Sequence, residues 1–548
     1  MKVLPLAGIS ASLAIQGVVA YGLRAESSNT TIVDLGYAVH QGSLNSTYNF
    51  YSFKNIRYGE APVGELRWRP SIPPQQINRT LNDGSVERQC PQAFPRWLLE
   101  PQAANAGLPV ETLANIILSD KRLNEDCLFL DVHVPTKVFA KRGKSGSGAA
   151  VMLWIHGGGY AIGYKDQSPF NTPAGLIERS TLDNQEGVIF ISINYRLGMF
   201  GFLNRNGTDM VGNAGFWDQR TALEWVQKHI HLFGGDRNRV TVIGESAGAG
   251  SIVHQITAFG GKGKAPFAAA IVQSPALPMT DLSAESWETT VAAASKIAGK
   301  PIQNIQDLRQ LNSSALMQIN QAASFNSLFG TFTYVPTVDG EFSSDLPGVL
   351  LEKGHFYQNV KVMAGHNKNE SGMFTPEIKT EEEFLSYFDA SQPMPASERD
   401  LILSQLYPNV LDGTFGYTTQ FGRANLLFDE MTFSCNTRWL GTAFLNQTYN
   451  YRFEYPPGSH GQDLAWTFFV KEDPAVNAEL AISMQRYFTN FAMKGDPNGE
   501  GVSGLAPFPV YSEQANLAIF GQEGVGTAVD GLANHRCDYW QKGTFRSR

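Results

Sequence analysis

A serine flanked by glycines two residues before and two residues after it is the first candidate for chemistry in this sequence. The pattern Gly-Glu-Ser-Ala-Gly occupies residues 244–248, after a β-branched run at 239–243 and before a stretch with helical character. A serine on a sharp turn between strand and helix exposes its hydroxyl, and neighbours without Cβ permit the close approach that this turn needs. We therefore predict that Ser246 is a nucleophile and that the Ala247 N–H can stabilise an oxyanion.

A nucleophilic serine requires a base, and histidine is the commonest one. His460 follows an apolar stretch at 449–455 and has Gly458 and Gly461 close by, so its loop could carry the imidazole over a sheet edge. His535 is the alternative, but it lies near the C-terminus and no strand is predicted directly before it.

The base in turn requires a carboxylate that orients it. Glu370 follows the predicted strand that ends at Ala364 and is the preferred candidate. Asp339 is the alternative, although its Val-Asp-Gly context is typical of a turn.

Three consecutive glycines, Gly157, Gly158 and Gly159, follow an uninterrupted apolar stretch at 149–155. Backbone N–H groups in such a loop could stabilise a developing oxyanion together with Ala247. A phosphate-binding loop would require a Gly-Lys-Ser/Thr sequence, which is absent. We therefore predict that this loop supplies two donors of an oxyanion hole and that Ala247 supplies the third.

The predicted strands and helices that must position these residues alternate along the sequence. Continuous apolar strands separated by helical segments indicate a mostly parallel sheet covered on both faces. Residues 214–232 have helical spacing, and the segments from about 280 to 355 and 375 to 445 are predicted to be helical caps on the sheet. The predicted strands are 31–34, 48–53, 128–134, 149–155, 188–194, 239–243, 268–273, 360–364, 449–455 and, as the last one, 517–520.

The composition indicates a globular protein with a large core. The chain has 548 residues, a hydrophobic content of 43% and a formal net charge of −8. Because no basic run is available to neutralise phosphates, we expect no nucleic-acid partner. No cysteine or histidine spacing typical of a metal site is visible, so we expect neither a metal nor a cofactor.

The N-terminal residues resemble a secretory signal peptide. Residues 1–20 have a basic start, an apolar centre and small residues at their end, and cleavage is expected between residues 20 and 25. A transmembrane anchor is the alternative, but polar residues and a proline interrupt the apolar stretch, and no lipid-anchor tail is visible. We therefore expect residues 26–548 to be a single, secreted, extracellular domain without a transmembrane anchor.

Sequons and cysteines agree with export. Glycosylation is predicted at Asn29, Asn45, Asn78, Asn206, Asn312 and Asn446. The four cysteines are expected to pair in an oxidising compartment, although the sequence alone permits three connectivities. The segment between Cys90 and Cys127 shows little strand signal, and a loop of this length is typically a lid or a binding loop.

Several motifs between about residues 50 and 540 together resemble the type-B carboxylesterase/lipase family, to which cholinesterases belong, and in particular a secreted fungal member. These motifs are Pro62–Arg67, Glu125–Leu128, His156–Tyr160, Asn213–Arg220, Phe233–Asp236 and Gly244–Gly248. The resemblance implies an α/β-hydrolase fold and a catalytic triad of Ser246, Glu370 and His460. It also implies an oxyanion hole formed by Gly158, Gly159 and Ala247.

The resemblance further implies polar support, disulfides and a substrate pocket. Glu245 and Ser274 would lie beside the triad, and disulfides would join Cys90 to Cys127 and Cys435 to Cys537. Candidate pocket residues are Trp97, Tyr160 and Phe332. Cholinesterases carry a tryptophan for a cationic substrate deep in the first disulfide loop, whereas Trp97 lies close to Cys90, so specialisation for choline esters is not expected.

The sequon at Asn369 lies directly beside the proposed acid. If Glu370 lies in a buried site, Asn369 should be poorly accessible, and we predict that it is unmodified.

The function predicted from the sequence is hydrolysis of a small-molecule or lipid carboxylic ester through an acyl-enzyme. A second hypothesis keeps the acyl-enzyme but transfers the acyl group to an alcohol, as in a tailoring enzyme of fungal secondary metabolism. A third is a non-catalytic binding module of the same fold, but such modules typically lack part of the triad.

Overall fold

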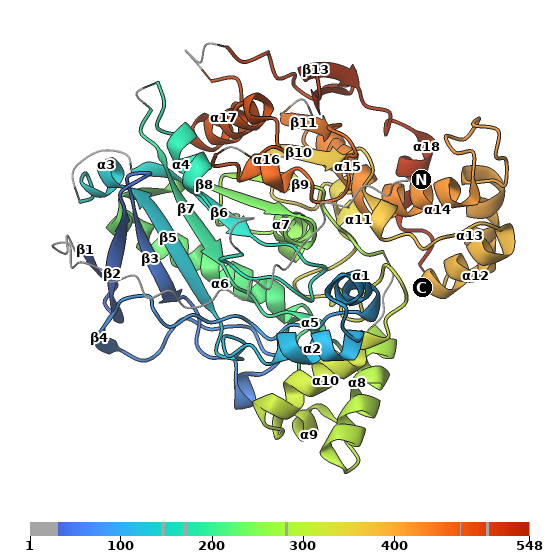
Figure 1. Cartoon of the computed structure of the whole chain (residues 1–548), viewed down its shortest axis with the longest axis horizontal. Helices are drawn as coiled ribbons and strands as arrows, with labels where there is room; N and C mark the ends of the chain where they lie inside the picture. The colour runs from blue at the N-terminus through green and yellow to red at the C-terminus, as the bar shows by residue number, and fades with distance from the viewer. Residues whose placement is uncertain are drawn as a thin grey trace.

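The computed structural model describes residues 31–143, 148–167, 172–183, 185–205, 207–279, 283–445, 447–471, 473–499 and 504–546. The predicted signal peptide and the sequons at Asn29, Asn206 and Asn446 lie outside the described residues. Helices surround a sheet that has 13 strands in the described part of the chain (Figure 1). The strand order is β1-β2-β3-β5-β7-β6-β8-β9-β10-β11-β12-β13, and β4 pairs with β2.

The strands vary from short edge strands to the long β8. In chain order they are β1 (Thr31–Asp34), β2 (Ala38–Asn45), β3 (Phe50–Arg57), β4 (Asn78–Asn82), β5 (Phe129–Pro135), β6 (Ala149–Ile155), β7 (Val188–Ile193), β8 (Gly235–Glu245), β9 (Ala269–Gln273), β10 (Lys361–Asn367), β11 (Thr448–Phe453), β12 (Asn516–Gly521) and β13 (Gly524–Val529).

The centre of the sheet is parallel, as predicted. Neighbouring strands from β7 through β6, β8, β9, β10 and β11 to β12 pair in parallel, whereas β1-β2-β3-β5-β7 and β12-β13 pair antiparallel. The sheet is therefore mixed, with a parallel centre and antiparallel edges. The carboxyl ends of the central strands meet at one edge, where loops can bring distant residues together.

Helices precede, separate and follow these strands. The α-helices are α1 (Arg96–Ala106), α2 (Val110–Leu118), α3 (Thr136–Phe139), α4 (Ala174–Arg179), α5 (Gly198–Phe202), α6 (Ala214–His229), α7 (Ala247–Thr257), α8 (Ser283–Ala298), α9 (Ile305–Arg309), α10 (Ser313–Phe325), α11 (Pro347–Glu352), α12 (Glu381–Ser391), α13 (Ala396–Leu401), α14 (Gln420–Asp429), α15 (Cys435–Ala443), α16 (Leu464–Thr467), α17 (Ala478–Lys494) and α18 (His535–Lys542). The shorter turns are η1 (Gly64–Leu66), η2 (Ile230–Phe233), η3 (Ala258–Gly261), η4 (Ser371–Met373) and the π-helical η5 (Ile402–Leu406) and η6 (Glu430–Ser434).

Strand β6 shows how the sequence builds a core on both faces of the sheet. All of its residues are buried, which explains its uninterrupted apolar sequence. Alternate side chains point to opposite faces, so Val151 and Leu153 pack with α6 and α7, whereas Met152 and Trp154 pack with α4, α16 and α17.

The helical caps lie where the sequence predicts them. Helices α8 to α11 fall within 280–355, and α12 to α15 fall within 375–445. Figure 1 shows α8, α9 and α10 at the bottom of the molecule and α12, α13 and α14 on its right. Among the described residues, no helix is long and apolar enough to cross a membrane.

The structure corrects three expectations about individual elements. The segment between Cys90 and Cys127 is not an irregular loop, because it contains α1 and α2, whose apolar residues pack together with Phe325. The strand at 516–521 is not the last one, because β13 pairs with it antiparallel. Strands β2 and β4 are additional to the predicted ones.

Both disulfides implied by the family resemblance are present. Cys90 is bonded to Cys127 across a sequence separation of 37, and Cys435 is bonded to Cys537 across a separation of 102. The first bond encloses α1 and α2. The second joins the start of α15 to α18.

Candidate active site

Ser246 occupies the turn between β8 and α7, as the glycine pattern predicts. Its backbone has φ 56° and ψ −125°, a conformation that L-residues rarely adopt. The Ser246 N–H donates to the Gln273 carbonyl at 3.0 Å, and the Ser246 carbonyl accepts from the Ala276 N–H at 3.1 Å. A Cβ at Gly248 would lie 2.1 Å from the Ile155 carbonyl oxygen, so the close approach of α7 to β6 requires a glycine there.

The glycine loop after β6 passes beside this turn. A Cβ at Gly157 would lie 3.0 Å from the Ser246 Cβ. Within the described residues the N–H groups of Gly158 and Gly159 donate no hydrogen bond, and Ala247 begins α7, so its N–H has no intrahelical acceptor. Gly158, Gly159 and Ala247 therefore each have a backbone N–H without such a partner, and they belong to the two segments that meet where Gly157 approaches Ser246.

The structure brings His460 and Glu370 into direct contact. Glu370 follows β10 and His460 follows β11, and these neighbouring parallel strands deliver both loops to one edge of the sheet. His460 Nδ1 lies 2.6 Å from Glu370 Oε2, and Glu370 is completely buried. The other carboxylate oxygen, Oε1, accepts the Asn367 N–H at 2.5 Å, which fixes the carboxylate in place.

The alternative base and acid occupy other environments. His535 is the first residue of α18. Asp339 accepts a hydrogen bond from Asn213 Nδ2 at 2.8 Å and another from the Ser343 N–H at 2.9 Å, so it organises a turn. The pairing at the site is therefore between His460 and Glu370.

Glu245 lies on the other side of the imidazole. Its Oε1 is 3.3 Å from His460 Nε2, and both side chains are buried. Burial raises the pKa of Glu245 to about 8, and His460 only partly offsets this effect. Burial lowers the pKa of His460, but the carboxyl groups of Glu245 and Glu370 outweigh burial and raise it to about 9.

A buried polar network that sequence reasoning missed supports the His460 loop. Asp463 accepts hydrogen bonds from Gln273 Nε2 at 2.8 Å and from Asn367 Nδ2 at 3.3 Å. Asn367 Nδ2 also donates to the Ser459 carbonyl at 2.7 Å. The position of Asp463, three residues after His460, was the available signal, because both residues lie in the segment after β11.

Ser274 is buried in the turn after β9 but does not contact His460 directly. It has φ 50°, and its N–H donates to the Gly365 carbonyl at 2.7 Å. Its hydroxyl makes no hydrogen bond within the described part of the chain. Ser274 therefore fixes the turn after β9. The residue before it, Gln273, accepts the hydrogen bond from the Ser246 N–H.

Four aromatic side chains, which we call the aromatic wall, extend from His460 to α1. The ring centroids of Phe433 and Phe374 lie 4.6 and 5.2 Å from that of His460. The Trp97 ring lies 5.9 Å from Phe374 and 5.6 Å from Phe332. Trp97 and Phe332 were predicted pocket residues, whereas Phe374 and Phe433 were missed because nothing in their local sequence distinguishes them from core residues.

Phe332 lies against the glycine loop, but Tyr160 does not take part in the wall. A Cβ at Gly159 would lie 2.2 Å from Phe332 Cζ. The Trp97 indole N–H donates to the Thr331 carbonyl at 3.0 Å, which joins α1 to the segment before Phe332. Tyr160 is 1% exposed, and its hydroxyl donates to the Ala276 carbonyl at 2.8 Å. Its position therefore favours a structural role over contact with a substrate.

Among the described residues, no group of three or more histidine, cysteine, aspartate or glutamate side chains could hold a metal ion. The chemistry available at the site is that of the serine hydroxyl, the imidazole, the buried carboxyl groups and the backbone amides.

A strained serine between a strand and a helix, with a histidine and a carboxylate on loops after later parallel strands, defines the α/β-hydrolase class of protein. Residues 30–540 match the sequence profile of the Carboxylesterase family, and the chain belongs to this family. It is accordingly a carboxylic ester hydrolase of the serine type.

Similar proteins agree with this assignment. Carboxylesterase patB of Aspergillus clavatus is 38% identical over 550 residues, which cover 94% of this chain and 97% of that protein. Carboxylesterase patB of Penicillium expansum is 35% identical, covering 94% and 96% of the two chains. The crystal structure of Aspergillus niger EstA has a TM-score of 0.77 at 23% identity and covers 93% of this chain and 98% of its own, which shows the shared fold.

Proposed function

We propose that this protein hydrolyses uncharged carboxylic esters through an acyl-enzyme formed on Ser246, with His460 as general base and Glu370 as its orienting carboxylate. The observation that carries the proposal is the 2.6 Å contact between His460 Nδ1 and the buried Glu370 carboxylate, at the same sheet edge as the strained Ser246. This arrangement fixes one imidazole nitrogen and leaves Nε2 to exchange protons.

In the first step, Ser246 Oγ attacks the carbonyl carbon of the ester while its proton moves to His460 Nε2. The electron pair of the carbonyl bond moves to the oxygen, which the N–H groups of Gly158, Gly159 and Ala247 stabilise. Because these amides are already in place, little reorganisation is needed when the charge develops.

The tetrahedral intermediate then collapses. His460 returns the proton to the leaving alcohol, and an acyl group remains on Ser246. Water then attacks the acyl-enzyme and gives its proton to His460 Nε2. When the second tetrahedral intermediate collapses, His460 returns this proton to Ser246 Oγ and the carboxylic acid is released. Glu370 stabilises the imidazolium that forms in each half-reaction.

Covalent labelling together with substitution tests this assignment. A fluorophosphonate probe should label Ser246, and Ser246→Ala should lose labelling and nearly all turnover because no other nucleophile occupies the turn. Glu370→Gln should retain the fold but lose most of kcat. Ser251→Ala, which changes a buried serine one turn along α7, serves as the control and should retain labelling. Undiminished ester hydrolysis by Ser246→Ala would refute the proposal.

Product analysis distinguishes hydrolysis from acyl transfer. The enzyme is given a simple ester in water that contains increasing concentrations of a competing alcohol. If the enzyme is a hydrolase, free acid should be the main product at low alcohol concentration. A new ester that dominates even at millimolar alcohol would instead assign an acyltransferase.

The aromatic wall supports an apolar substrate group beside His460. Its rings are hydrocarbon surfaces, and the carboxyl groups of Glu245, Glu370 and Asp463 close to His460 disfavour an anionic substrate. We expect higher kcat/KM for neutral esters with an apolar or aromatic group than for anionic esters of equal size. Equal values across a matched series would contradict this substrate class.

The first disulfide segment is held on several sides, which favours activity on dissolved esters. Besides the Cys90–Cys127 bond, Gln321 exchanges two hydrogen bonds with the Phe94 backbone, at 2.9 and 2.8 Å. We therefore expect rates to follow the concentration of monomeric ester without a jump at its solubility limit. Such a jump would indicate that α1 and α2 open as an interfacial lid.

We further propose that the protein is secreted. The two disulfides fit an oxidising compartment, and the described sequons at Asn78 and Asn312 are exposed. Expression with the native N-terminus should place the enzyme in the culture medium and yield a mature chain that begins between residues 21 and 26. Retention of the uncleaved chain inside the cell would contradict the proposal.

A further inference from the structure

One face of α14 holds the loop that carries Glu370. Asn425 and Asp429 are four residues apart on α14 and therefore lie on the same side of the helix. Together they contact three consecutive residues of the loop after β10: Asn369, Glu370 and Ser371.

Each of these contacts is a hydrogen bond. Asn425 Nδ2 donates to Asn369 Oδ1 at 3.2 Å, and the Ser371 hydroxyl donates to the Asn425 carbonyl at 2.6 Å. The Glu370 N–H donates to Asp429 Oδ2 at 3.2 Å. The backbone of the proposed acid is therefore fixed from the α14 side, while its carboxylate is fixed by Asn367 and His460.

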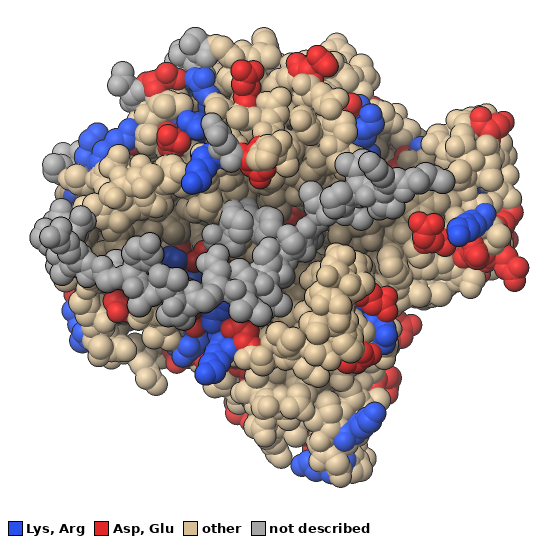
Figure 2. All heavy atoms as spheres, viewed as in Figure 1, with Lys and Arg blue, Asp and Glu red and all other residues tan. Residues whose placement is uncertain are grey.

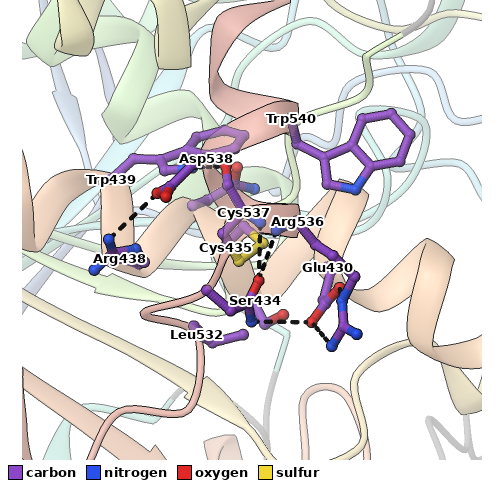
Figure 3. Close-up of a disulfide and its surroundings, with 12 residues drawn as sticks. Glu430, Ser434, Cys435, Arg438, Trp439, Leu532, Arg536, Cys537, Asp538 and Trp540 are labelled. Atoms are coloured by element: carbon purple, nitrogen blue, oxygen red, sulfur yellow. Dashed lines mark hydrogen bonds and ion pairs between the residues drawn. A yellow bond between two sulfur atoms is a disulfide. The ribbon is translucent and has the colours of Figure 1, made fainter. Parts of the chain in front are cut away.

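The segment after Asp429 is anchored to the C-terminal helix α18 (Figure 3). Glu430 pairs with Arg536 through two hydrogen bonds, at 2.6 and 2.8 Å. The Cys435–Cys537 disulfide closes the same connection five residues further along the chain. Asp429 thus lies between the Glu370 loop and a segment that is attached to α18 by a disulfide and a partly buried ion pair.

We propose that Asp429 is a positioning residue that holds the Glu370 backbone, and thereby its carboxylate, in register with His460. The inference rests on the proposed function, because it takes Glu370 as the carboxylate of the triad. Asp429 itself touches neither the substrate nor the reacting atoms.

The surroundings of Asp429 also connect its charge to Glu370. Asp429 Oδ1 has no hydrogen-bond partner within the described residues, and the side chain is buried. The charged groups that face it are Glu370 on the loop after β10 and Glu430 of η6, which Arg536 of α18 neutralises. Burial and the nearby Glu370 carboxylate raise the pKa of Asp429 to about 8. Ionisation of Asp429 therefore adds a negative charge beside the Glu370 carboxylate at mildly alkaline pH.

Two near-isosteric substitutions separate the hydrogen bond from the charge. Asp429→Asn keeps an oxygen for the Glu370 N–H but cannot ionise, whereas Asp429→Leu has neither property. We expect Asp429→Leu to lower kcat about 10- to 100-fold with little change in KM, because a misplaced catalytic group slows the chemical step more than binding. Asp429→Asn should stay within about threefold of the wild type, which is the range of a retained hydrogen bond. In Asp429→Leu the acidic limb of the pH profile of kcat/KM should also move to lower pH, because a displaced Glu370 carboxylate raises the pKa of His460 less, whereas in Asp429→Asn the limb should stay in place.

Asp530→Asn provides a matched control for the loss of a buried carboxyl group. Asp530 is 2% exposed and accepts a hydrogen bond from the Tyr511 hydroxyl, so its replacement should lower stability without moving the pH profile. If folded Asp429→Leu and Asp429→Asn both kept the kcat and the pH profile of the wild-type enzyme, the inference would be overturned. If Glu370→Gln also kept full turnover, the proposed triad itself would fail, and the two failures are therefore distinguishable.

Discussion

At the scale of single residues, the proposed mechanism makes activity depend on the protonation state of His460. Its Nδ1 contacts Glu370 and its Nε2 faces Glu245, so both nitrogens have carboxyl neighbours. These neighbours favour the imidazolium, yet a general base must be neutral before it can accept the serine proton. Because the pKa of His460 is raised to about 9, the active form increases as the pH rises toward 9.

The first prediction concerns Glu245. In the wild-type enzyme, kcat/KM should rise with pH along an acidic limb well above the ordinary histidine value of 6.5. Glu245→Gln removes a carboxyl group that raises the pKa of His460, so the limb should move to lower pH. A profile of kcat/KM from pH 5 to about pH 10 measures the shift. An acidic limb that stays in place in a folded Glu245→Gln enzyme would contradict the coupling.

The second prediction concerns the contact between Gly159 and Phe332. Gly159 has φ 59°, and a Cβ there would meet the Phe332 ring at 2.2 Å. Gly159→Ala should lower kcat by roughly two to three orders of magnitude, as expected for loss of one oxyanion donor.

A double variant tests the cause of this loss. Gly159→Ala combined with Phe332→Ala removes the steric conflict and should regain part of the activity, whereas Phe332→Ala alone should mainly change the preference among acyl groups. If the double variant were no better than Gly159→Ala, strain in the backbone rather than the ring would be responsible.

The sequence indicates the proposed reacting groups more readily than the groups that support them. Ser246, Glu370 and His460 have local signatures, because each lies in a turn directly after a strand. Asp429 could not be found in this way, since it ends a cap helix and meets Glu370 only through the tertiary fold.

At the scale of elements, the two disulfides should differ in function although both stabilise the fold. In the chain-entropy model, closing loops with separations of 37 and 102 residues contributes about 4 and about 5 kcal/mol respectively. We expect Cys90→Ser with Cys127→Ser to lower the Tm but leave kcat nearly unchanged, because Gln321 and Thr331 still hold α1.

Removal of the second disulfide should have an additional effect. Cys435→Ser with Cys537→Ser frees the segment after Asp429, so kcat should fall severalfold even at temperatures where circular dichroism shows both double variants to be folded. The ratio of their kcat values at 15 to 25 °C is the measurement, and equal values would argue against a link between α18 and the Glu370 loop.

The sequence indicates most of the central elements and misses the peripheral ones for physical reasons. Strand β6 is buried on both faces, so its apolar run is unambiguous. Strand β4 is almost wholly exposed and β13 contains two glycines, so neither shows the alternation of a half-buried strand. Helix α1 contains Pro101, which conceals its helical character in the sequence. Helix α2 has apolar residues at helical spacing, and this spacing could have predicted it.

At the scale of the whole molecule, the surface carries both signs of charge. Figure 2 shows acidic side chains gathered at the right of the molecule, the region of α12 and α13 in Figure 1, and Lys and Arg side chains dispersed over the rest of the described surface in this view. The first turn of α12 alone contributes Glu381, Glu382 and Glu383. The net charge of −8 should favour solubility of the isolated protein.

The last prediction concerns glycan placement and follows from the proposed secretion of the chain. Asn78 and Asn312 are exposed and Asn45 is half-buried, and within the described residues their Nδ2 atoms donate no hydrogen bond. Asn369 is also half-buried, but its Oδ1 accepts from Asn425, and it lies beside buried Glu370. Peptide mapping after endoglycosidase treatment should find modification at Asn45, Asn78 and Asn312 but not at Asn369. Glycan on Asn369 would count against a buried acid at residue 370.

The attachment of Asp429 to α18 has a consequence for the biogenesis of the enzyme. Arg536 and Cys537 belong to α18, and Cys537 follows Cys435 by 102 residues, so a ribosome makes the partners of Glu430 and Cys435 long after the Glu370 loop. A partly synthesised chain can build the nucleophile turn and the glycine loop, but its acid loop still lacks this anchor. We therefore expect full turnover to appear only after α18 has been synthesised and Cys537 has been oxidised to its disulfide with Cys435.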